Sequence, residues 1–374
     1  MSTAVHNHLV PVRNRVERFF LDWFLLLVPG VYALRMTVQY AESGRLPYAL
    51  LDTVKMAAEL AILIALTLAN QWLATIGPTI SSLFSNGVAA ARTEEASELD
   101  TIQGQCAQTL ERQLNHSVRI VIALIMAFAT LYYYVRRMGG LAVFDRSSSA
   151  LQILDVILYF LPTVCYAYFV GTVTWRLFVT SWFFLRFPDR YALTPRFLHP
   201  DGACGLLPLG DLCLRMMYVA VIPTVISALF LLAHFAPDGI AGYLAANTTL
   251  LYGFTPLILS VGIIGLVIGF LPLFRFHLTL IRHQDEWTAQ LAVLADRIIT
   301  EKARIMTPSE DSTALPLDVV LNTITGLQSH YEASRRVRMW PVDTGQVTRI
   351  WGSVALVSGQ LLAFAEAVRT ISSP

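Results

Sequence analysis

The feature that most restricts the fold of this chain is the length of its uncharged apolar stretches. Leu60–Ala91 contains 32 consecutive residues without a charge, and Gly239–Phe274 contains 36. A helix needs about 20 mostly apolar residues to cross the hydrocarbon core of a bilayer. Charged residues make up only 14% of the chain, well below the share of about 25% typical of soluble domains. The sequence therefore predicts an all-α, polytopic membrane protein and argues against a soluble enzyme.

Six segments qualify as candidate spans, of which the last two are the strongest. They lie near residues 19–39, 56–77, 116–136, 152–175, 214–236 and 249–274. The chain then divides into an N-terminal cytoplasmic segment (1–18), a transmembrane domain (19–281) and a cytoplasmic helical region (282–374). Three arginines precede the first span without a small-residue cleavage pattern after it, which predicts a signal anchor.

Basic residues in the short loops predict the orientation. The loop 238–249 contains no Lys or Arg, whereas basic residues flank the loop 187–213 and follow the sixth span. Because basic loops stay in the cytoplasm, we expect both termini on the cytoplasmic side of a bacterial inner membrane. The loops 35–55 and 136–150 would then be external, although each carries three basic residues. A re-entrant segment in the first half of the chain is an alternative that would resolve this conflict.

The fourth span continues beyond its expected end. After Arg176 the chain stays apolar from Leu177 to Leu185. A continuous helix over 152–186 would be about 52 Å long, more than the bilayer core requires. We expect the chain to bend there and lie along the interface on Trp175 and Trp182. A straight helix projecting into the cytoplasm is the alternative.

The region after residue 282 has the pattern of soluble helices. Apolar residues from Trp287 to Ile305 recur at helical spacing, Pro308 ends this helix, and a second helix is expected from Pro316. We expect the two to form a hairpin that buries their apolar faces, and a bundle contributed by several subunits is the alternative. The polar stretch 93–112 is expected to pack against this hairpin.

The stretch 350–365 is uncharged but short for a span. Gly352 and Gly359 weaken it further as a membrane helix. We favour an interfacial or subunit-packing helix here over a seventh crossing, with a half-span buried by neighbouring subunits as a third possibility.

The loop 198–211 concentrates glycine, proline, acidic residues and a histidine, which predicts a defined turn. In one interpretation, His199 and Asp201 face a pore mouth or a ligand. In the favoured one, Asp201 caps the turn and His199 hydrogen-bonds backbone. These two side chains supply two ligands and no third lies nearby in the sequence, so no metal site is predicted.

A resemblance rests on this loop and a later segment. His199-Pro-Asp-Gly-Ala-Cys-Gly-Leu206 resembles the H-P-D-x-x-G-G-L pattern of uncharacterised bacterial multi-pass membrane proteins, and Trp340-Pro-Val-Asp343 resembles their W-P-x-D segment. The chain departs from the pattern at Cys204, where glycine is expected. The resemblance implies a shared membrane fold and implies no reaction.

Charged residues within spans are candidates for function because their burial in lipid is costly. Arg176 could line an aqueous path that favours anions, or could mark the level of the cytoplasmic headgroups. Asp155 and Glu59, near the outer ends of two spans, could form a vestibule that attracts cations or could pair with nearby basic residues.

The sixth span carries small residues at helix-packing spacing. Gly262, Gly265 and Gly269 could pack against another helix or allow a gate to bend, and Pro256 and Pro272 bracket them. Close packing is the favoured interpretation.

These features lead to a main functional prediction and two alternatives. The first is an oligomeric ion channel or pore, gated through the cytoplasmic helices. The second is a non-conducting membrane sensor or scaffold that binds a cytoplasmic protein. A lipid-modifying enzyme using His199 and Asp201 is the weakest. The expected partners are the lipid bilayer and further copies of the chain, with no nucleic acid, because the net charge is only +1, and no cofactor, because no cofactor motif is present.

Overall fold

The computed structural model describes residues 49–91, 99–137, 161–196, 199–234, 255–306 and 317–336, with single residues between 30 and 37 and between 340 and 366. This part of the chain is mostly helical. Its elements, in chain order, are α3 (Ala49–Ser85), β1 (Ala89–Ala91), α4 (Leu99–Leu114), α5 (Val118–Arg137), α8 (Leu161–Leu185), α9 (Phe187–Arg190), β2 (Tyr191–Leu193), α10 (Leu207–His234), α12 (Thr255–Met306) and α13 (Leu317–Arg336).

Three helical stretches among the described residues are long and apolar enough to cross a membrane. They are Leu63–Ser85, Thr101–Tyr132 and Gly262–Arg297. The prediction of an α-helical membrane protein is confirmed at this level, while the six-span arrangement stays a prediction. The first predicted span lies almost entirely outside the described residues.

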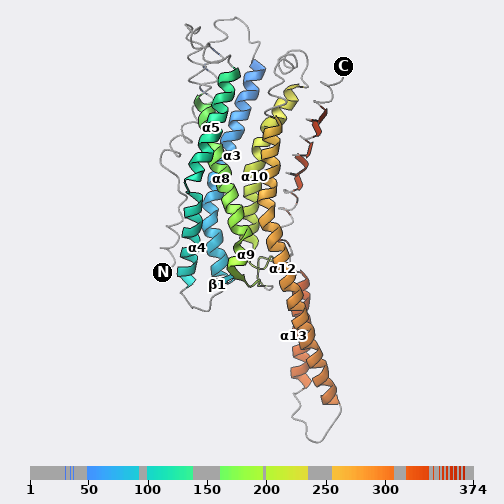
Figure 1. The fold of residues 1–374 in the computed structure, drawn as a ribbon. Helices are drawn as coiled ribbons and strands as arrows, with labels where there is room; N and C mark the ends of the chain where they lie inside the picture. Colours follow the sequence, from blue (N-terminus) through green and yellow to red (C-terminus); the bar gives the residue numbers. More distant parts are fainter. Residues whose placement is uncertain are drawn as a thin grey trace.

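The long helices run side by side as one bundle (Figure 1). In this bundle α10 packs between α3 and α12, while α5 packs along α8. Helix α8 also contacts α12 and α3. The α5–α8 pair therefore belongs to the same bundle as α3, α10 and α12. Its core includes Trp72 and Ile80 of α3, Leu209 of α10 and Leu273 of α12, all inaccessible to solvent.

The bend expected after Arg176 is not observed in helix α8. The helix continues without interruption from Leu161 to Leu185. Phe183 and Phe184 are buried because the lower part of α8 packs inside the bundle, whereas Trp182 is exposed. The apolar continuation therefore fills the bundle core, which an amphipathic interfacial helix would not do.

The packing on the hairpin that was expected for the stretch 93–112 is not observed for helix α4. It packs against α8 and α3, and it continues towards α5 on the side of the bundle away from α13 (Figure 1). Gln103, Cys106, Ala107 and Leu110 are buried. Their spacing of three and four residues puts them on one helical face, and this face covers the bundle.

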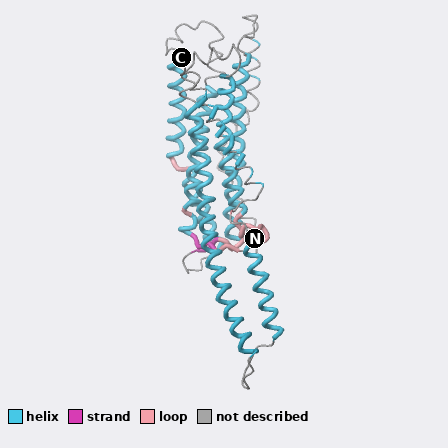
Figure 2. The backbone as a smooth tube through the Cα atoms, turned by 90° about the vertical axis from the view of Figure 1, so that its right-hand side faces the viewer, coloured by secondary structure: helices cyan, strands magenta, loops and turns pink. Residues whose placement is uncertain are grey.

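Helix α12 connects the bundle to a projecting hairpin. Its 52 residues correspond to a length of about 78 Å, so it continues far beyond the bundle, where α13 packs along it (Figure 2). It ends at Met306 and α13 begins at Leu317, as the prolines predict. The predicted burial of the hairpin's apolar stripe is only partly correct, because Leu291 is buried but Leu294 is 45% exposed.

A two-stranded sheet closes the end of the bundle from which the hairpin projects (Figure 2). β1 and β2 are antiparallel, with Ala89 opposite Leu193 and Ala91 opposite Tyr191. Phe84 and Phe187 pack beside the sheet with their ring centroids 6.2 Å apart. The sheet thus joins the segment after α3 to the segment after α9.

The described residues between 345 and 366 lie alongside the bundle, in the half remote from the hairpin (Figure 1). The choice between an interfacial or subunit-packing helix, a seventh crossing and a half-span stays a prediction.

Candidate functional site

The predicted turn between α9 and α10 is built around the carboxylate of Asp201. Its Oδ1 accepts hydrogen bonds from the backbone N–H groups of Ala203 at 2.9 Å and Gly205 at 3.0 Å. Its Oδ2 accepts one from the N–H of Leu207, the first residue of α10, at 3.3 Å. The side chain therefore satisfies two N–H groups of the turn and one of the N–H groups that the start of a helix leaves without a partner.

The imidazole of His199 completes this arrangement. Its Nδ1 lies 3.0 Å from Oδ1 of Asp201, and the two side chains are 21% and 12% exposed. Burial raises the pKa of the Asp201 carboxyl, but the hydrogen bonds from Gly205, Ala203, His199 and Leu207 outweigh it, so the pKa lies below its ordinary value. Asp201 is a part-buried, ionised cap, which favours the structural interpretation of this pair over catalysis.

Cys204 has a left-handed backbone conformation, with φ of 58°. Only glycine adopts this conformation without a steric cost, which explains why glycine is expected at this place in the pattern that the loop resembles. The Cys204 side chain is buried, and burial, followed by the charge of Asp201, raises the pKa of its thiol to about 12. The thiol is therefore protonated at neutral pH and is a poor nucleophile.

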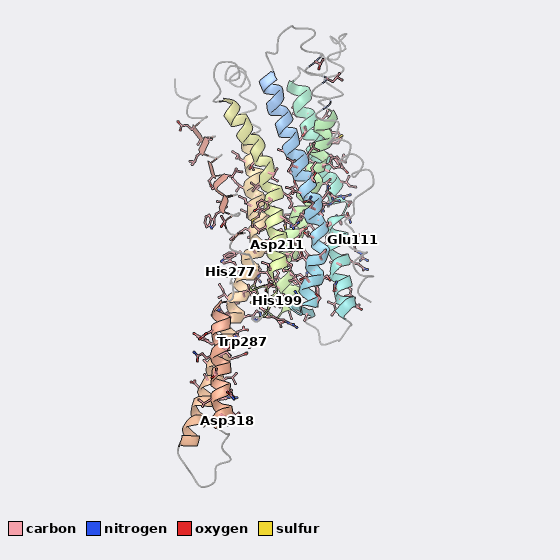
Figure 3. All side chains as sticks on the ribbon, turned by 180° about the vertical axis from the view of Figure 1, so that it is seen from behind. Glu111, His199, Asp211, His277, Trp287 and Asp318 are labelled. Atoms are coloured by element: carbon pink, nitrogen blue, oxygen red, sulfur yellow. The ribbon has the colours of Figure 1, made fainter. Side chains whose placement is uncertain are left out.

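The turn is fixed to the segment that follows α3. The N–H of Thr194 donates to the carbonyl of Val88 at 2.9 Å, and its Oγ1 donates to the carbonyl of Gly87 at 2.9 Å. A side chain at Gly205 would overlap Val88, so glycine is needed where the two segments meet. His199 lies at the end of the bundle next to the origin of the hairpin (Figure 3).

The second candidate region is a polar stripe inside the bundle. Thr172, Arg176 and Thr180 occur at intervals of four residues along α8 and are at most 5% exposed, so they share one helical face. Among the groups described, the hydroxyl of Thr180 and the indole N–H of Trp72 are buried without a hydrogen-bond partner. Arg176 is thus an interior residue of the bundle.

The glycines of α12 pack against α10 of the same chain. A Cβ at Gly262 would overlap Thr224, one at Gly265 would overlap Ala220, and one at Gly269 would overlap Met217. This agrees with the favoured prediction of close packing. The glycine face is covered within the subunit, so it is not available at a subunit axis.

Pro272 is buried inside α12. It leaves one backbone carbonyl of α12 without its usual donor, and a residue of α8 that the sequence does not identify replaces that donor. Proline has no N–H, so it cannot bond the carbonyl of Ile268 four residues earlier. Ser181 of α8 donates its hydroxyl to that carbonyl at 2.5 Å. A neighbouring helix thus satisfies the group that proline leaves free, as membrane helices commonly require. Ile268 is identifiable from the spacing, but its donor is not.

Trp340 of the W-P-x-D segment packs on α12. Its ring stacks on that of His277, with centroids 4.1 Å apart and planes 10° apart, and lies 5.6 Å from the ring of Phe270. This contact brings the chain that follows α13 back to the bundle. The sequence marked the segment as part of a resemblance but predicted no role for Trp340.

For three of the remaining predicted residues the structure describes no side chain. Asp155 lies outside the described residues, and Glu59 and Pro256 lie in α3 and α12 without described side chains. The structure therefore brings together His199 and Asp201, and separately the glycine face and α10, while the predicted vestibule of Asp155 and Glu59 lies outside the described side chains. Within the described ranges, no group of three His, Cys, Asp or Glu side chains could hold a metal ion.

Comparisons with protein-family models, curated proteins and solved structures find no match to this chain.

Proposed function

We propose that this chain is a membrane-embedded scaffold that presents its helical hairpin to a protein partner. The observation that carries the proposal is the continuity of α12, which runs from the glycine face packed on α10 to Met306 at the tip of the hairpin. A single helix of this length makes the position of the hairpin depend directly on packing within the bundle. The bundle would act as the anchor and sensor, and the hairpin as the binding element.

The surface of the hairpin supports this proposal. Val293 and Leu294 of α12, together with Val319, Leu321 and Tyr331 of α13, are between 43% and 53% exposed. Exposed apolar residues of this number on a helical pair are typical of a surface that another protein covers. The exposed face also carries charges of both signs, including Asp296, Arg297 and Glu332, which suits pairing with a second copy of the chain.

The membrane arrangement of this scaffold follows the sequence. We place six spans in a bacterial inner membrane with the N-terminus, the turn at Asp201 and the hairpin in the cytoplasm, because the basic residues flank these loops. The described residues between 345 and 366 lie beside the bundle (Figure 1), and a helix over this range would measure about 33 Å. This supports a seventh crossing, which would place the C-terminus outside. Impermeant thiol labelling of Pro374→Cys on intact cells distinguishes the two locations.

The assembly state of the purified full chain tests the scaffold proposal. Native mass spectrometry in detergent should show an oligomer, and the double variant Leu294→Glu/Leu321→Glu should dissociate it. Gln328→Lys, an exposed substitution on the same hairpin whose new charge can pair with Glu332 in place of the present hydrogen bond, is the control and should leave the oligomer intact. An oligomer that survives the double variant, with an unchanged melting temperature, would contradict assembly through this surface.

A gated pore is the second candidate, favoured by the buried stripe of Thr172, Arg176 and Thr180. A buried hydroxyl without a protein partner is commonly satisfied by water, and an arginine in such a path would favour anions. Protein reconstituted in liposomes should then conduct anions, and Arg176→Gln should reduce the preference for anions over cations. Arg282→Gln, at an exposed position on α12, is the control. Absence of ion flux from folded oligomers would exclude the pore and leave the scaffold proposal standing.

A further inference from the structure

A cavity of about 150 Å³ lies in the bundle where four helices meet. α3 contributes Leu66, α8 contributes Val173 and Leu177, α10 contributes Ala220, and α12 contributes Ile264 and Gly265. Close packing of protein interiors leaves few voids larger than a water molecule. A void of this size between packed helices is therefore a feature that an occupant would stabilise.

The cavity is too apolar to hold water. A buried water needs two to four polar partners, and the lining is almost entirely hydrocarbon. Its one hydroxyl belongs to Thr174, which already donates to the carbonyl of Val170 at 2.8 Å. Apolar cavities of this size stay dry and accept small apolar groups.

The lining extends from the core to the outside of the bundle. Val219 and Ala220 at one end are 4% exposed, whereas Ile264 on α12 is 56% exposed and Thr174 on α8 is also exposed. The hydrogen bond from Ser181 to the carbonyl of Ile268, which also lines the cavity, holds α8 and α12 at a fixed separation there. The cavity thus opens on the bundle surface between α8 and α12.

The location of this opening identifies the occupant. Leu66 belongs to the candidate span Leu63–Ser85, and Ile264 and Gly265 belong to the candidate span Gly262–Arg297. A surface at this level of a membrane protein contacts lipid chains rather than water. From this geometry we infer that the cavity is a binding site for the terminal segment of one acyl chain of a bilayer phospholipid, which inserts between α8 and α12 and reaches the buried face of α10.

Photo-crosslinking in reconstituted vesicles tests this inference. The full chain is placed in phosphatidylcholine vesicles containing a phosphatidylcholine with a diazirine near the end of one acyl chain, irradiated, and mapped by mass spectrometry. Adducts are expected on Val219 or Ala220, which are buried, and not on Leu209, which is equally buried but does not line the cavity. The absence of adducts on Val219 and Ala220 from the wild-type chain overturns the inference without any variant.

Three valine-to-phenylalanine substitutions distinguish labelling in the cavity from labelling at the outer surface of the bundle. Val173→Phe fills the cavity and should reduce labelling of Val219 and Ala220 to the level of Leu209, with Val170→Phe as a second filling variant. Val121→Phe on α5, where the side chain is 54% exposed, should leave this labelling unchanged. Equal labelling in all folded variants would overturn the inference, because the chain would then reach α10 by another route.

Discussion

The hydroxyl of Ser181 on α8 donates a hydrogen bond to the backbone carbonyl of Ile268 on α12. That carbonyl has no donor within its own helix because proline occupies position 272. Two helices are therefore joined at the point where one of them lacks a backbone hydrogen bond.

Removing this hydroxyl should destabilise the bundle. Ser181→Ala leaves the part-buried carbonyl of Ile268 without this donor, which we expect to cost about 1–2 kcal/mol in the free energy of unfolding. In a Pro272→Ala background the new N–H can bond the same carbonyl, so the cost should be smaller. A double-mutant cycle from thermal melts in detergent measures this coupling. Additive effects of the two substitutions would show that the Ser181 hydroxyl does not compensate for the backbone hydrogen bond that Pro272 removes.

The glycines of α12 and α13 should respond in opposite ways to alanine. Gly265→Ala adds a methyl group where Ala220 already lies, and overpacking of this kind costs about 1–3 kcal/mol. Gly326 in α13 has no neighbouring atom within 4 Å of an added Cβ, so Gly326→Ala should stabilise its helix by about 0.5–1 kcal/mol. Melting temperatures of the two variants against the wild type decide the matter. A stabilising Gly265→Ala would disprove the close contact with α10.

The backbone conformation of Cys204 predicts a preference for glycine. Cys204→Gly relieves a left-handed residue and should stabilise the turn by up to about 1 kcal/mol, whereas Cys204→Val should destabilise it because a β-branched residue fits this conformation worst. The apparent melting temperature of each variant provides the measurement. The prediction fails if valine is tolerated as well as glycine.

The Cys204 thiol should not react in the folded protein. Its side chain is buried and its pKa is raised to about 12, so a water-soluble maleimide at pH 7 should modify it only after denaturation. Peptide mapping before and after unfolding in detergent at high temperature tests this. Labelling of the native protein at Cys204 would mean that the turn opens.

Asp201 should make stability depend on pH in the acid range. Its pKa is lowered in the folded state, so the stability it contributes is present above the unfolded value of about 3.9 and is lost as pH falls through the folded value. Asp201→Asn keeps an acceptor oxygen but loses the charge that strengthens these hydrogen bonds, so it should cost about 1 kcal/mol at pH 7. The difference in melting temperature between this variant and the wild type should shrink below pH 4. A constant difference across pH 3–7 would refute the role of the ionised carboxylate.

Helical content, membrane-compatible apolar stretches and the ends of the hairpin helices could be read from residue order, since they depend on local hydropathy and on prolines that interrupt helices. The left-handed position at Cys204 was visible only as a departure from a resembling pattern. The helical character of α4 likewise follows from composition. None of these inferences needs knowledge of which helices are neighbours.

Neighbour relations came from three-dimensional packing. Hydropathy predicts that Gly265 and Ser181 lie in apolar helices. It does not predict that Gly265 faces Ala220 or that Ser181 bonds the carbonyl of Ile268. The same limit explains the wrong expectations for α4 and for the end of α8, whose apolar faces were assigned to the hairpin and to the membrane interface. An apolar face has the same favourable free energy of burial against any apolar surface, so its partner is chosen by the shape and hydrogen bonding of the whole bundle.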